Sequence, residues 1–386
     1  MSNLNIKLRV IGGLLGIFLL SVGISYAAFS YLSKMGVGKT VSPQGMGGAR
    51  NKIDLSLPKT EECPLNGQMF TKAEREIWEK RRPLGVMIEN HTEARPQSGL
   101  SSADVVYEAV AEGAITRFLV VFYCGASAEE VMIGPVRSAR TYYLDWVSEY
   151  GQAPLYAHVG GANRSGPADA LGQIEKYGWY LYNDLNQFSI GLDAFRKEME
   201  RLPDVATEHQ MYATTDKLWT VAAERGLTYK DKNGVAWNKG FVQWKFADGQ
   251  PSASPPTTRI SFPFWEGYMQ YAVLWTYDQS TNTYKRENGG GSHKDLNNDT
   301  QIYASNVVVM FTTMKYLNDP EKHLLYTTTG SGKALFFQNG NVTEGKWSKK
   351  SRTDRTIFTD KAGKEILFVR GPIWIEVLET GSKVTY

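Results

Sequence analysis

The sequence has few cysteines and no concentrated positive charge. Only two cysteines, Cys63 and Cys124, occur in 386 residues. They lack C-x-x-C spacing, which excludes a cysteine-based zinc site and a thioredoxin-type motif. The formal net charge is only +3, and no stretch is rich in lysine or arginine. This balance gives no indication of nucleic-acid binding, and none is predicted.

Familiar catalytic and ligand-binding motifs are also missing. The "GSGK" stretch is no phosphate loop, because Thr327 stands where a glycine is needed and Ala334 follows the lysine. The "DLNNDT" stretch imitates a calcium loop, but Thr300 replaces its glycine and Asn306 its bidentate glutamate. No G-x-S-x-G, H-E-x-x-H or dinucleotide fingerprint occurs. The sequence therefore leaves the catalytic residues unknown and makes an enzyme the less favoured hypothesis. It predicts no metal site and no cofactor, apart from magnesium under the alternative hypothesis below.

One uncharged segment dominates the N-terminal end. Residues 10–33 carry no charge and follow Lys7 and Arg9. About 20 apolar residues can cross a bilayer, and the leading cations favour a cytoplasmic N-terminus. A cleaved secretory signal is the alternative, because "SYAA" around Ala27 resembles a cleavage site. Residues 1–33 are therefore predicted to be a membrane anchor or signal segment. We expect a single-pass protein of the cell membrane, extracytoplasmic after about residue 34.

The extracytoplasmic location bears on whether the two cysteines are oxidised to a disulfide. Outside the cytoplasm a disulfide between Cys63 and Cys124 is the natural interpretation. It would close a long loop and stabilise the fold by roughly 3–4 kcal/mol. Two separate buried thiols remain the alternative.

The rest of the chain is predicted to contain a spacer and two folded parts. Residues 34–62, rich in Gly, Ser, Pro and Lys, indicate a flexible spacer. In residues 63–228 apolar strands alternate with helical patterns, including "LDAFRKEMERL" (192–202), which predicts a mixed α/β or α+β domain. Residues 229–386 contain short strands separated by Gly, Asn and Asp turns, which predicts an all-β domain. Aromatics make up 12% of the chain, which favours sheets and broad binding surfaces.

An acidic pattern lies within the strand predicted over residues 103–111. Strand alternation places Asp104, Glu108 and Glu112 on one face. Arg117, after the next turn, can return beside Glu108 or Glu112 as a cross-strand partner. These charges indicate either structural ion pairs or a functional polar face.

The stretch "GPVRSAR" follows with two arginines beside a strand-to-helix turn. Ser138 could cap the helix, whose N-terminus would suit an anion. Arg137 and Arg140 would add bidentate donors for a carboxylate or phosphate. Alternatively, these arginines neutralise Asp104, Glu108 and Glu112.

Two further places carry polar side chains at strand ends. The connection "IENHTEARPQSG" presents Asn90, Arg95 and Gln97 where α/β folds usually place ligand loops. His158 ends the strand "LYAH" and is followed by two glycines. It could act as a general base or be a hydrogen-bonded structural histidine.

The series "RPLGVMIEN", "ARPQSGL", "ADVVYE", "ITRF" and "GPVRSAR" resembles the YerB-like bacterial lipoprotein family, a paired domain of unknown function. "NVVVMF", "GSGKALFFQNG", "GKWSK" and "WIEV" resemble its second part, so the resemblance covers about residues 82–377. It implies a Gram-positive-type cell-surface protein with an α/β part and a β part, and no established reaction. This chain has no cysteine near the end of its apolar segment, so a transmembrane anchor replaces the lipid anchor here.

These observations lead to two hypotheses. The first is a membrane-anchored envelope protein that binds a wall precursor, a wall polymer or a wall-synthesis enzyme through a polar cleft, with an aromatic surface on the β domain. The second is a phosphotransferase, loosely like the LytR-CpsA-Psr enzymes, in which Arg137 and Arg140 hold a pyrophosphate and Asp104 or Glu108 helps to place magnesium. The cleft is expected to contain Asn90, Arg95, Gln97, Asp104, Glu108, Glu112, Arg117, Arg137, Arg140 and His158.

Overall fold

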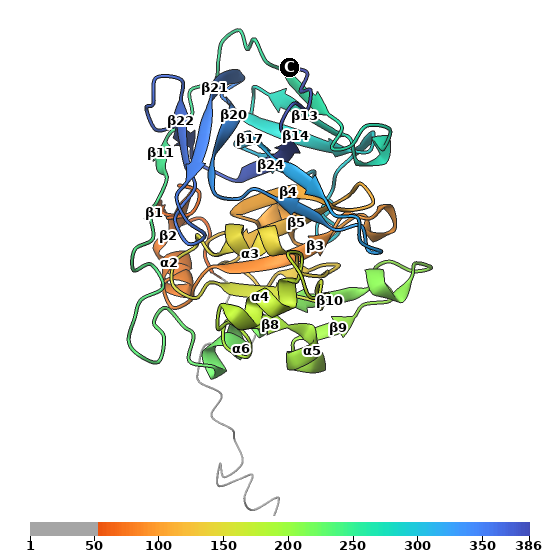
Figure 1. Cartoon of the computed structure of the whole chain (residues 1–386). Coiled ribbons are helices and arrows are strands. Elements are labelled where there is room, and N and C mark those ends of the chain that lie inside the picture. Colours follow the sequence, from red (N-terminus) through yellow and green to blue (C-terminus); the bar gives the residue numbers. More distant parts are fainter. Residues whose placement is uncertain (1–52) are drawn as a thin grey trace, which may run out of the picture. The chain divides into compact units, whose positions relative to one another are not determined.

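The largest feature of this computed structural model, which describes residues 53–386, is a ten-stranded sheet. The strand order is β22-β21-β20-β17-β24-β4-β5-β3-β7-β8 (Figure 1). Its first half comprises β22 (Ile357–Asp360), β21 (Asn341–Lys349), β20 (Gly330–Gln338), β17 (Asn306–Thr312) and β24 (Ile373–Glu379). Its second half comprises β4 (Val105–Glu112), β5 (Ile115–Phe122), β3 (Leu84–Glu89), β7 (Leu155–His158) and β8 (Asp184–Asn186).

The two halves of the chain meet within this sheet. Strand β24 pairs in parallel with β4, with Ile373 opposite Val105 and Glu376 opposite Glu108. The sheet therefore continues across the boundary predicted between residues 228 and 229. The described residues lie in one compact unit.

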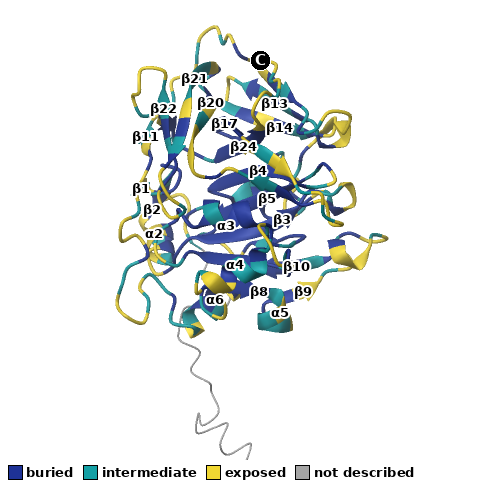
Figure 2. Ribbon diagram, in the orientation of Figure 1, coloured by how far each residue is buried: buried dark blue, intermediate teal, exposed yellow. Residues whose placement is uncertain are grey.

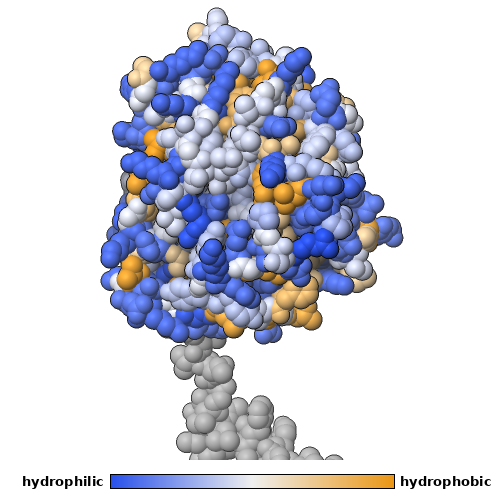
Figure 3. All heavy atoms as spheres, in the orientation of Figure 1, coloured by the Kyte–Doolittle hydropathy of each residue, from blue (hydrophilic) through white to orange (hydrophobic). Residues whose placement is uncertain are grey.

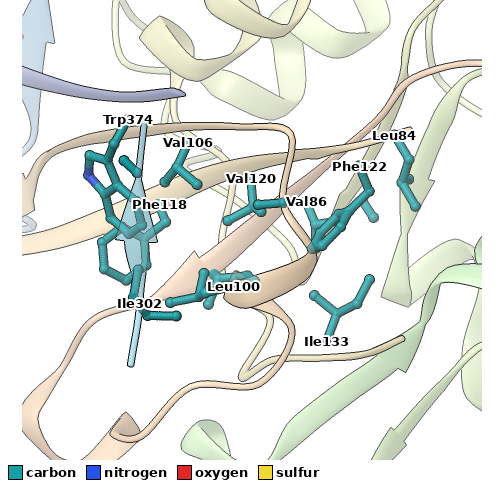
Figure 4. Close-up of a cluster of buried hydrophobic side chains, with 14 of the residues drawn as sticks. Leu84, Val86, Leu100, Val106, Phe118, Val120, Phe122, Ile133, Ile302 and Trp374 are labelled. Atoms are coloured by element: carbon teal, nitrogen blue, oxygen red, sulfur yellow. The ribbon is translucent and has the colours of Figure 1, made fainter. Parts of the chain in front are cut away.

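Strand alternation divides the apolar core between the two faces of the sheet. Val106 of β4, Phe118 of β5 and Trp374 of β24 belong to one cluster (Figure 4). Val105 and Tyr107 belong to the other cluster. Both faces of the central strands are covered, so these strands are almost entirely buried (Figure 2). This explains why they read as nearly continuous apolar runs.

The first face is covered by two smaller sheets and a helix, whose buried residues join the cluster of Val106. One sheet has the order β6-β10-β9 and the other β12-β13-β14-β15, with β16 paired to β14. The bounds are β6 (Met132–Ile133), β9 (Phe195–Lys197), β10 (Met211–Thr214), α6 (Thr215–Glu224), β12 (Arg259–Phe262), β13 (Val273–Asp278), β14 (Thr283–Asn288), β15 (Gly291–Ser292) and β16 (Tyr303–Ala304).

The second face is covered by helices α2 (Lys72–Trp78), α3 (Thr141–Val147) and α4 (Ala170–Lys176). Helix α2 begins with a capping box in which Thr71 and Glu74 bond to each other's backbone N–H. The remaining elements are β1 (Lys59–Glu62), β2 (Met69–Thr71), α5 (Gln187–Ile190), β11 (Lys245–Ala247), β18 (Met314–Tyr316), β19 (Leu324–Tyr326) and β23 (Leu367–Val369), with short 3₁₀ turns η1 (Thr92–Ala94), η2 (Leu100–Ser102), η3 (Gly191–Asp193), η4 (Thr207–His209) and η5 (Met269–Tyr271).

The disulfide between Cys63 and Cys124 is confirmed. The two sulfurs are bonded and the Cα atoms are 6.0 Å apart. The bond attaches the segment after β1 to the end of β5 and closes a loop with a sequence separation of 61 residues. A cross-link over a loop of this length restricts the unfolded chain and stabilises the fold by about 4 kcal/mol.

Three expectations from the sequence are corrected. Residues 192–202 do not form a helix; Phe195–Lys197 form strand β9, which pairs with β10. Only one residue of β9 is buried, so pairing with a neighbouring strand outweighs local helix propensity. Lys59–Glu62, placed in the spacer by sequence, form β1 against β2. Every tryptophan except Trp265 is buried, so these rings build the core and do not form an aromatic binding surface.

The apolar segment at residues 10–33 lies outside the described residues, as does most of the predicted spacer. Between residues 53 and 386, no helix has both the length and the apolar character needed to cross a membrane.

Candidate functional site

A buried polar network joins the two halves of the chain on the first face of the sheet. We call it the bridging network. Glu108 of β4 and Glu376 of β24 are register neighbours, and both are fully buried. Arg286 of β14 reaches them from the covering sheet, and its Nη2 donates to Oε2 of Glu108 at 2.5 Å. Trp275 Nε1 donates to Oε1 of Glu376 at 2.8 Å. The network consists of Asn90, Arg95, Gln97, Glu108, Thr116, Arg286, Asn288, His293 and Glu376.

The two buried carboxyl groups share one nearby cation. Arg286 Nε lies 3.9 Å from Oε1 of Glu376, much farther than Nη2 lies from Glu108. Burial and the neighbouring charge of Glu108 raise the pKa of Glu376 well above its ordinary value. Glu376 therefore keeps its proton, and Glu108 supplies the negative charge opposite Arg286.

Asn90 connects this carboxyl pair to the polar loop that follows β3. Its Nδ2 donates to Glu108 Oε1 at 3.2 Å and to Thr116 Oγ1 at 2.7 Å. Its Oδ1 accepts from Arg95 Nε and Gln97 Nε2, both at 2.9 Å, and from Asn288 Nδ2 at 2.8 Å. One amide thus organises side chains from both halves of the chain.

His293 closes the network on its other side. Its Nδ1 lies 2.6 Å from Arg286 Nη1, and its Nε2 lies 2.8 Å from Gln97 Oε1. Burial, Arg286 and Arg95 lower the pKa of His293 well below its ordinary value. The ring is therefore neutral, with Nδ1 accepting from Arg286 and Nε2 donating to Gln97.

The network ends at a hollow of about 380 Å³ beside Arg95, which we call the Arg95 hollow. Within residues 53–386, Arg95 donates only to neutral oxygens: the side-chain and main-chain oxygens of Asn90, and the main-chain oxygen of Gln270 at 2.9 Å. Burial, with Arg286 nearby, lowers the pKa of Arg95 to about 10, so it is charged at neutral pH. The hollow is lined by Arg95, Pro96, Asn288, Gly291, Ser292, His293, Lys294, Asp295, Leu296 and Asp299.

Gly289 allows this guanidinium to approach the turn after β14. Its φ is +62°, and a Cβ at this position would lie 2.5 Å from the oxygen of Gln270 and 3.1 Å from Arg95 Nη1. Any side chain would therefore disturb the contact between Arg95 and Gln270.

Glu112, Arg117 and Arg140 form a second group, the edge cluster, near the ends of β4 and β5. Arg140 Nε donates to Glu112, and Arg117 Nη2 donates to Glu112 at 3.3 Å. Burial raises the pKa of Glu112, but Arg117 and Arg140 outweigh it, so the pKa is lowered overall. The cross-strand partnership expected between Arg117 and Glu112 is present.

The helix after "GPVRSAR" begins differently from the prediction. Arg140, not Ser138, occupies the N-cap of α3, without a capping hydrogen bond from its side chain. The main-chain oxygen of Ser138 accepts from Arg117 Nη1 at 3.0 Å. Arg137 donates to Glu89 and Glu208, both at 3.0 Å. Arg137 and Arg140 are therefore bound by different carboxylates, and neither contacts Asp104 or Glu108.

Asp104 and His158 serve the fold in separate places. The Asp104 carboxylate accepts from the main-chain N–H groups of Tyr123, Cys124 and Gly125 and from Asn66. Burial raises the pKa of Asp104 to about 7 despite these bonds. The ring nitrogens of His158 lie 2.6 Å from Asp184 Oδ1 and 2.6 Å from the oxygen of Gly160. Both nitrogens are in use, as expected of a structural histidine.

The ten residues expected in one cleft are thus divided among several groups. Asn90, Arg95, Gln97 and Glu108 come together, and Glu112, Arg117 and Arg140 form the edge cluster. Four partners from the second half of the chain are not among the residues predicted from the sequence: Arg286, Asn288, His293 and Glu376. One signal existed, because Arg286 and Asn288 share the buried face of β14 with Tyr284.

Comparisons with known proteins agree with this two-part arrangement. The family model "Protein of unknown function (DUF3048) N-terminal domain" matches residues 70–228, and the model of the C-terminal domain of the same family matches residues 260–375. These matches define the class: a paired domain of unknown function, in which β4 and β24 belong to different parts.

A similar sequence and a similar solved structure identify the family more closely. "Putative lipoprotein YerB" of Bacillus subtilis is 28% identical over 326 residues, which cover 83% of this chain and 87% of that protein. The crystal structure of Bacillus subtilis YerB matches with a TM-score of 0.67 and 25% identity, over 85% of this chain and 100% of that one. The chain belongs to this YerB-like, two-domain family.

Proposed function

We propose that this chain is a membrane-held envelope protein that lies outside the cytoplasm and binds an anionic wall component at the Arg95 hollow. Two observations support the location. The disulfide is typical of oxidising compartments, and the similar Bacillus protein is called a putative lipoprotein. Residues 10–33 are the proposed membrane anchor.

The observation that carries the binding proposal is the charge of Arg95. Within the bridging network, Arg95 and Arg286 supply two positive charges, whereas Glu108 alone supplies a negative one because Glu376 keeps its proton. Among the described residues, no carboxylate forms an ion pair with Arg95. Water screens a half-buried charge only partly, so an anion in the hollow would be attracted strongly.

The remaining charges beside the hollow leave Arg95 without a carboxylate partner, although Asp295 also lines the hollow and offsets one positive charge in the sum. Lys294 is paired with Asp299 at 2.8 Å. The Asp295 carboxylate accepts from the N–H groups of Gly99 and Ser101, at 3.0 and 2.8 Å, and orders that turn. Arg95 uses three of its five N–H donors, which leaves two for a carboxylate or phosphate oxygen.

The size of the hollow favours a small group over a protein surface. Its volume of about 380 Å³ lies near the lower end of ligand sites. One phosphate or carboxylate with an attached sugar or polyol would fit this volume. A repeat unit of a wall polymer or a wall precursor is therefore our proposed partner, ahead of a wall-synthesis enzyme. Figure 3 shows one face of the molecule, on which hydrophilic residues are mixed with smaller apolar patches.

The phosphotransferase alternative receives no support from these positions. It requires Asp104 or Glu108 to help place magnesium beside Arg137 and Arg140. Both carboxylates instead face buried donors, and both are fully buried.

The binding proposal can be tested by titrating the full chain with glycerol phosphate and with purified wall polymer in a calorimeter. Arg95→Lys keeps the charge but loses the planar fork, and Arg95→Gln loses both. We expect Arg95→Gln to weaken binding at least about tenfold, with a smaller loss for Arg95→Lys. Arg164→Gln is the matched control, because Arg164 is an exposed arginine paired with Glu321. Equal affinity in Arg95→Gln and Arg164→Gln would contradict the proposal.

A further inference from the structure

A group of two histidines and two glutamates lies outside the bridging network. Glu89 ends β3, His91 precedes η1, Glu93 lies within η1 and His209 ends η4. His209 Nδ1 lies 2.8 Å from Glu89 Oε2, and its Nε2 lies 3.5 Å from Glu93 Oε2. The rings of His91 and His209 are stacked, with centroids 4.8 Å apart. Glu89 and His209 are 120 residues apart in sequence, so no local motif reveals this group.

The hydrogen bond to Glu89 fixes the orientation of His209. A carboxylate accepts only, so Nδ1 of His209 must carry the hydrogen in this contact. In the neutral ring Nε2 is then an acceptor, and it faces the carboxylate of Glu93. Two acceptors that face each other at 3.5 Å have the arrangement of two ligands of one metal ion.

We propose that His91, Glu93 and His209 form a binding site for a divalent transition-metal ion, most suitably zinc. One potential ligand atom from each lies within 4.8 Å of the other two. Two ligands of a tetrahedral zinc ion lie roughly 3.4 Å apart when its bonds are about 2.0–2.2 Å long. The 3.5 Å between His209 Nε2 and Glu93 Oε2 already matches this separation. Imidazole and carboxylate ligands suit zinc well, whereas magnesium prefers oxygen alone.

Only His91 has to move. Its ring is parallel to that of His209, with 4° between the planes. The ring must therefore rotate so that a nitrogen lone pair points toward the metal position between His209 Nε2 and Glu93 Oε2. His91 is half-buried, and among the described residues its ring accepts one hydrogen bond, a 3.3 Å contact from the N–H of Glu93. Glu93 is about half exposed, with 54% of its side chain accessible, and can also adjust. Three protein ligands would leave a coordination position open to water or an anionic group.

Glu89 and Arg137 hold His209 in its orientation. A histidine that binds a metal usually donates its other ring N–H to a carboxylate, which fixes the ring and raises its basicity. Glu89 does this for His209, and Arg137 Nε holds the other oxygen of Glu89 at 3.0 Å. Arg137 also binds Glu208, the residue before His209. Glu89 is therefore a positioning residue for His209, and Arg137 fixes the carboxylate of Glu89.

The two other groups of possible ligands in the described chain are weaker. Cys63, Asp104 and Cys124 are excluded because the two sulfurs are joined in a disulfide. Asp319, Glu321 and His323 offer a single imidazole, which contacts Asp319 through Nδ1 at 2.7 Å. The imidazole is therefore already held by a carboxylate four residues away in the same loop, and no second histidine joins this group.

The test uses the full chain, without a polyhistidine tag, stripped with a chelator and titrated with zinc against a chromophoric indicator. We expect one equivalent to bind, with release of protons. His91→Ala and Glu93→Gln change exposed or half-buried ligands and should each weaken binding at least about tenfold. Glu89→Gln should weaken it about 10–100-fold, as supporting carboxylates do. Cobalt in place of zinc should give the visible absorption of a tetrahedral site.

His323→Ala is the matched control and should bind zinc as the unaltered chain does. His209→Ala is less useful, because it removes a buried partner of Glu89 and could unfold the loop. Failure of the unaltered chain to bind zinc would overturn the proposal and leave His209 as a structural residue between two carboxylates. Equal affinity in the unaltered chain, His91→Ala and Glu93→Gln would also overturn it.

Discussion

Two fully buried glutamates on opposite faces of the sheet behave in opposite ways. Glu149, just beyond α3, accepts from Lys349 Nζ at 2.8 Å, from Arg355 Nη1 at 2.7 Å and from Thr356. Burial raises the pKa of Glu149, but Lys349 and Arg355 outweigh it and bring the pKa to about 2. Glu376 shares a single arginine with Glu108, and its pKa is raised well above the ordinary value.

Both carboxyl groups are equally buried, so the number of nearby cations decides the outcome. On the second face, two cations and several neutral donors satisfy one carboxylate. On the first face, Arg286 serves two carboxyl groups, so one of them keeps a proton. That proton is why Glu376 does not offset the positive charge of Arg95, farther along the same network. The proposed binding site depends on this difference.

The largest effect is expected for Glu149→Gln. This substitution leaves Lys349 and Arg355 buried without their anion and should destabilise the fold by about 3–5 kcal/mol. Urea denaturation at neutral pH measures the change. Glu344→Gln is a matched control, because Glu344 forms an exposed pair with Lys361 and should cost at most about 1 kcal/mol. Similar losses of stability in both variants would contradict the expected difference between a buried and an exposed ion pair.

The acid dependence of stability should be nearly as large. The pKa of Glu149 is about 2 in the folded chain, against an ordinary value of 4.5. Its contribution is therefore fully present above pH 4.5 and is lost as the pH falls toward 2, a change of about 3 kcal/mol. Raised pKa values act in the opposite direction: Asp104 and Glu376 lose their contributions as the pH rises through their folded values. Stability measured by denaturation between pH 2 and 8 should fall at acid pH in the unaltered chain. In Glu149→Gln this fall should be absent.

Glu108→Gln should have an intermediate effect of about 2–3 kcal/mol. It removes the anion opposite Arg286. Burial still raises the pKa of Glu376, but the like charge of Glu108, the second cause of that shift, is gone, so Glu376 can ionise in its place. Chemical denaturation of this variant at pH 6 and pH 8 measures the loss of folding free energy and shows whether Glu376 has taken over the charge. A loss as large as that of Glu149→Gln would mean that Glu376 cannot take over the charge.

Glu376→Gln should have the smallest effect, at most about 1 kcal/mol. Glu376 already carries a proton, and a glutamine keeps the shape and can still accept from Trp275. Thermal and chemical denaturation should both show a near-neutral change. A loss comparable to that of Glu108→Gln would show that Glu376 is charged, and the positive surplus at Arg95 would then disappear.

The sequence predicts the parts of this arrangement that depend on local pattern. Strand alternation correctly places Glu108 with Val106 and Val110, and the short turn after β4 brings Arg117 to Glu112. It cannot predict contacts that depend on which strands become neighbours. Arg286 and Glu108 are 178 residues apart, and Asn288 and Asn90 are 198 apart.

The mistaken helix at residues 192–202 has a related cause. Its composition favours a helix, but β10 offers an edge for pairing, and Phe195 then enters the core. Ser138 was expected to cap α3 because serine is common there, yet its main-chain oxygen accepts from Arg117. Local preferences are weak compared with the pairing and burial that the whole fold provides.

The side-chain N–H signals of the arginines, followed by NMR in the full chain during addition of glycerol phosphate, test the central claim most directly. The Arg95 signal, assigned with Arg95→Lys, should shift and reach saturation. The signal of Arg286, which is fully buried and paired with Glu108, should not shift. An unmoved Arg95 signal at ligand concentrations that saturate binding would contradict the idea that this guanidinium receives the anion.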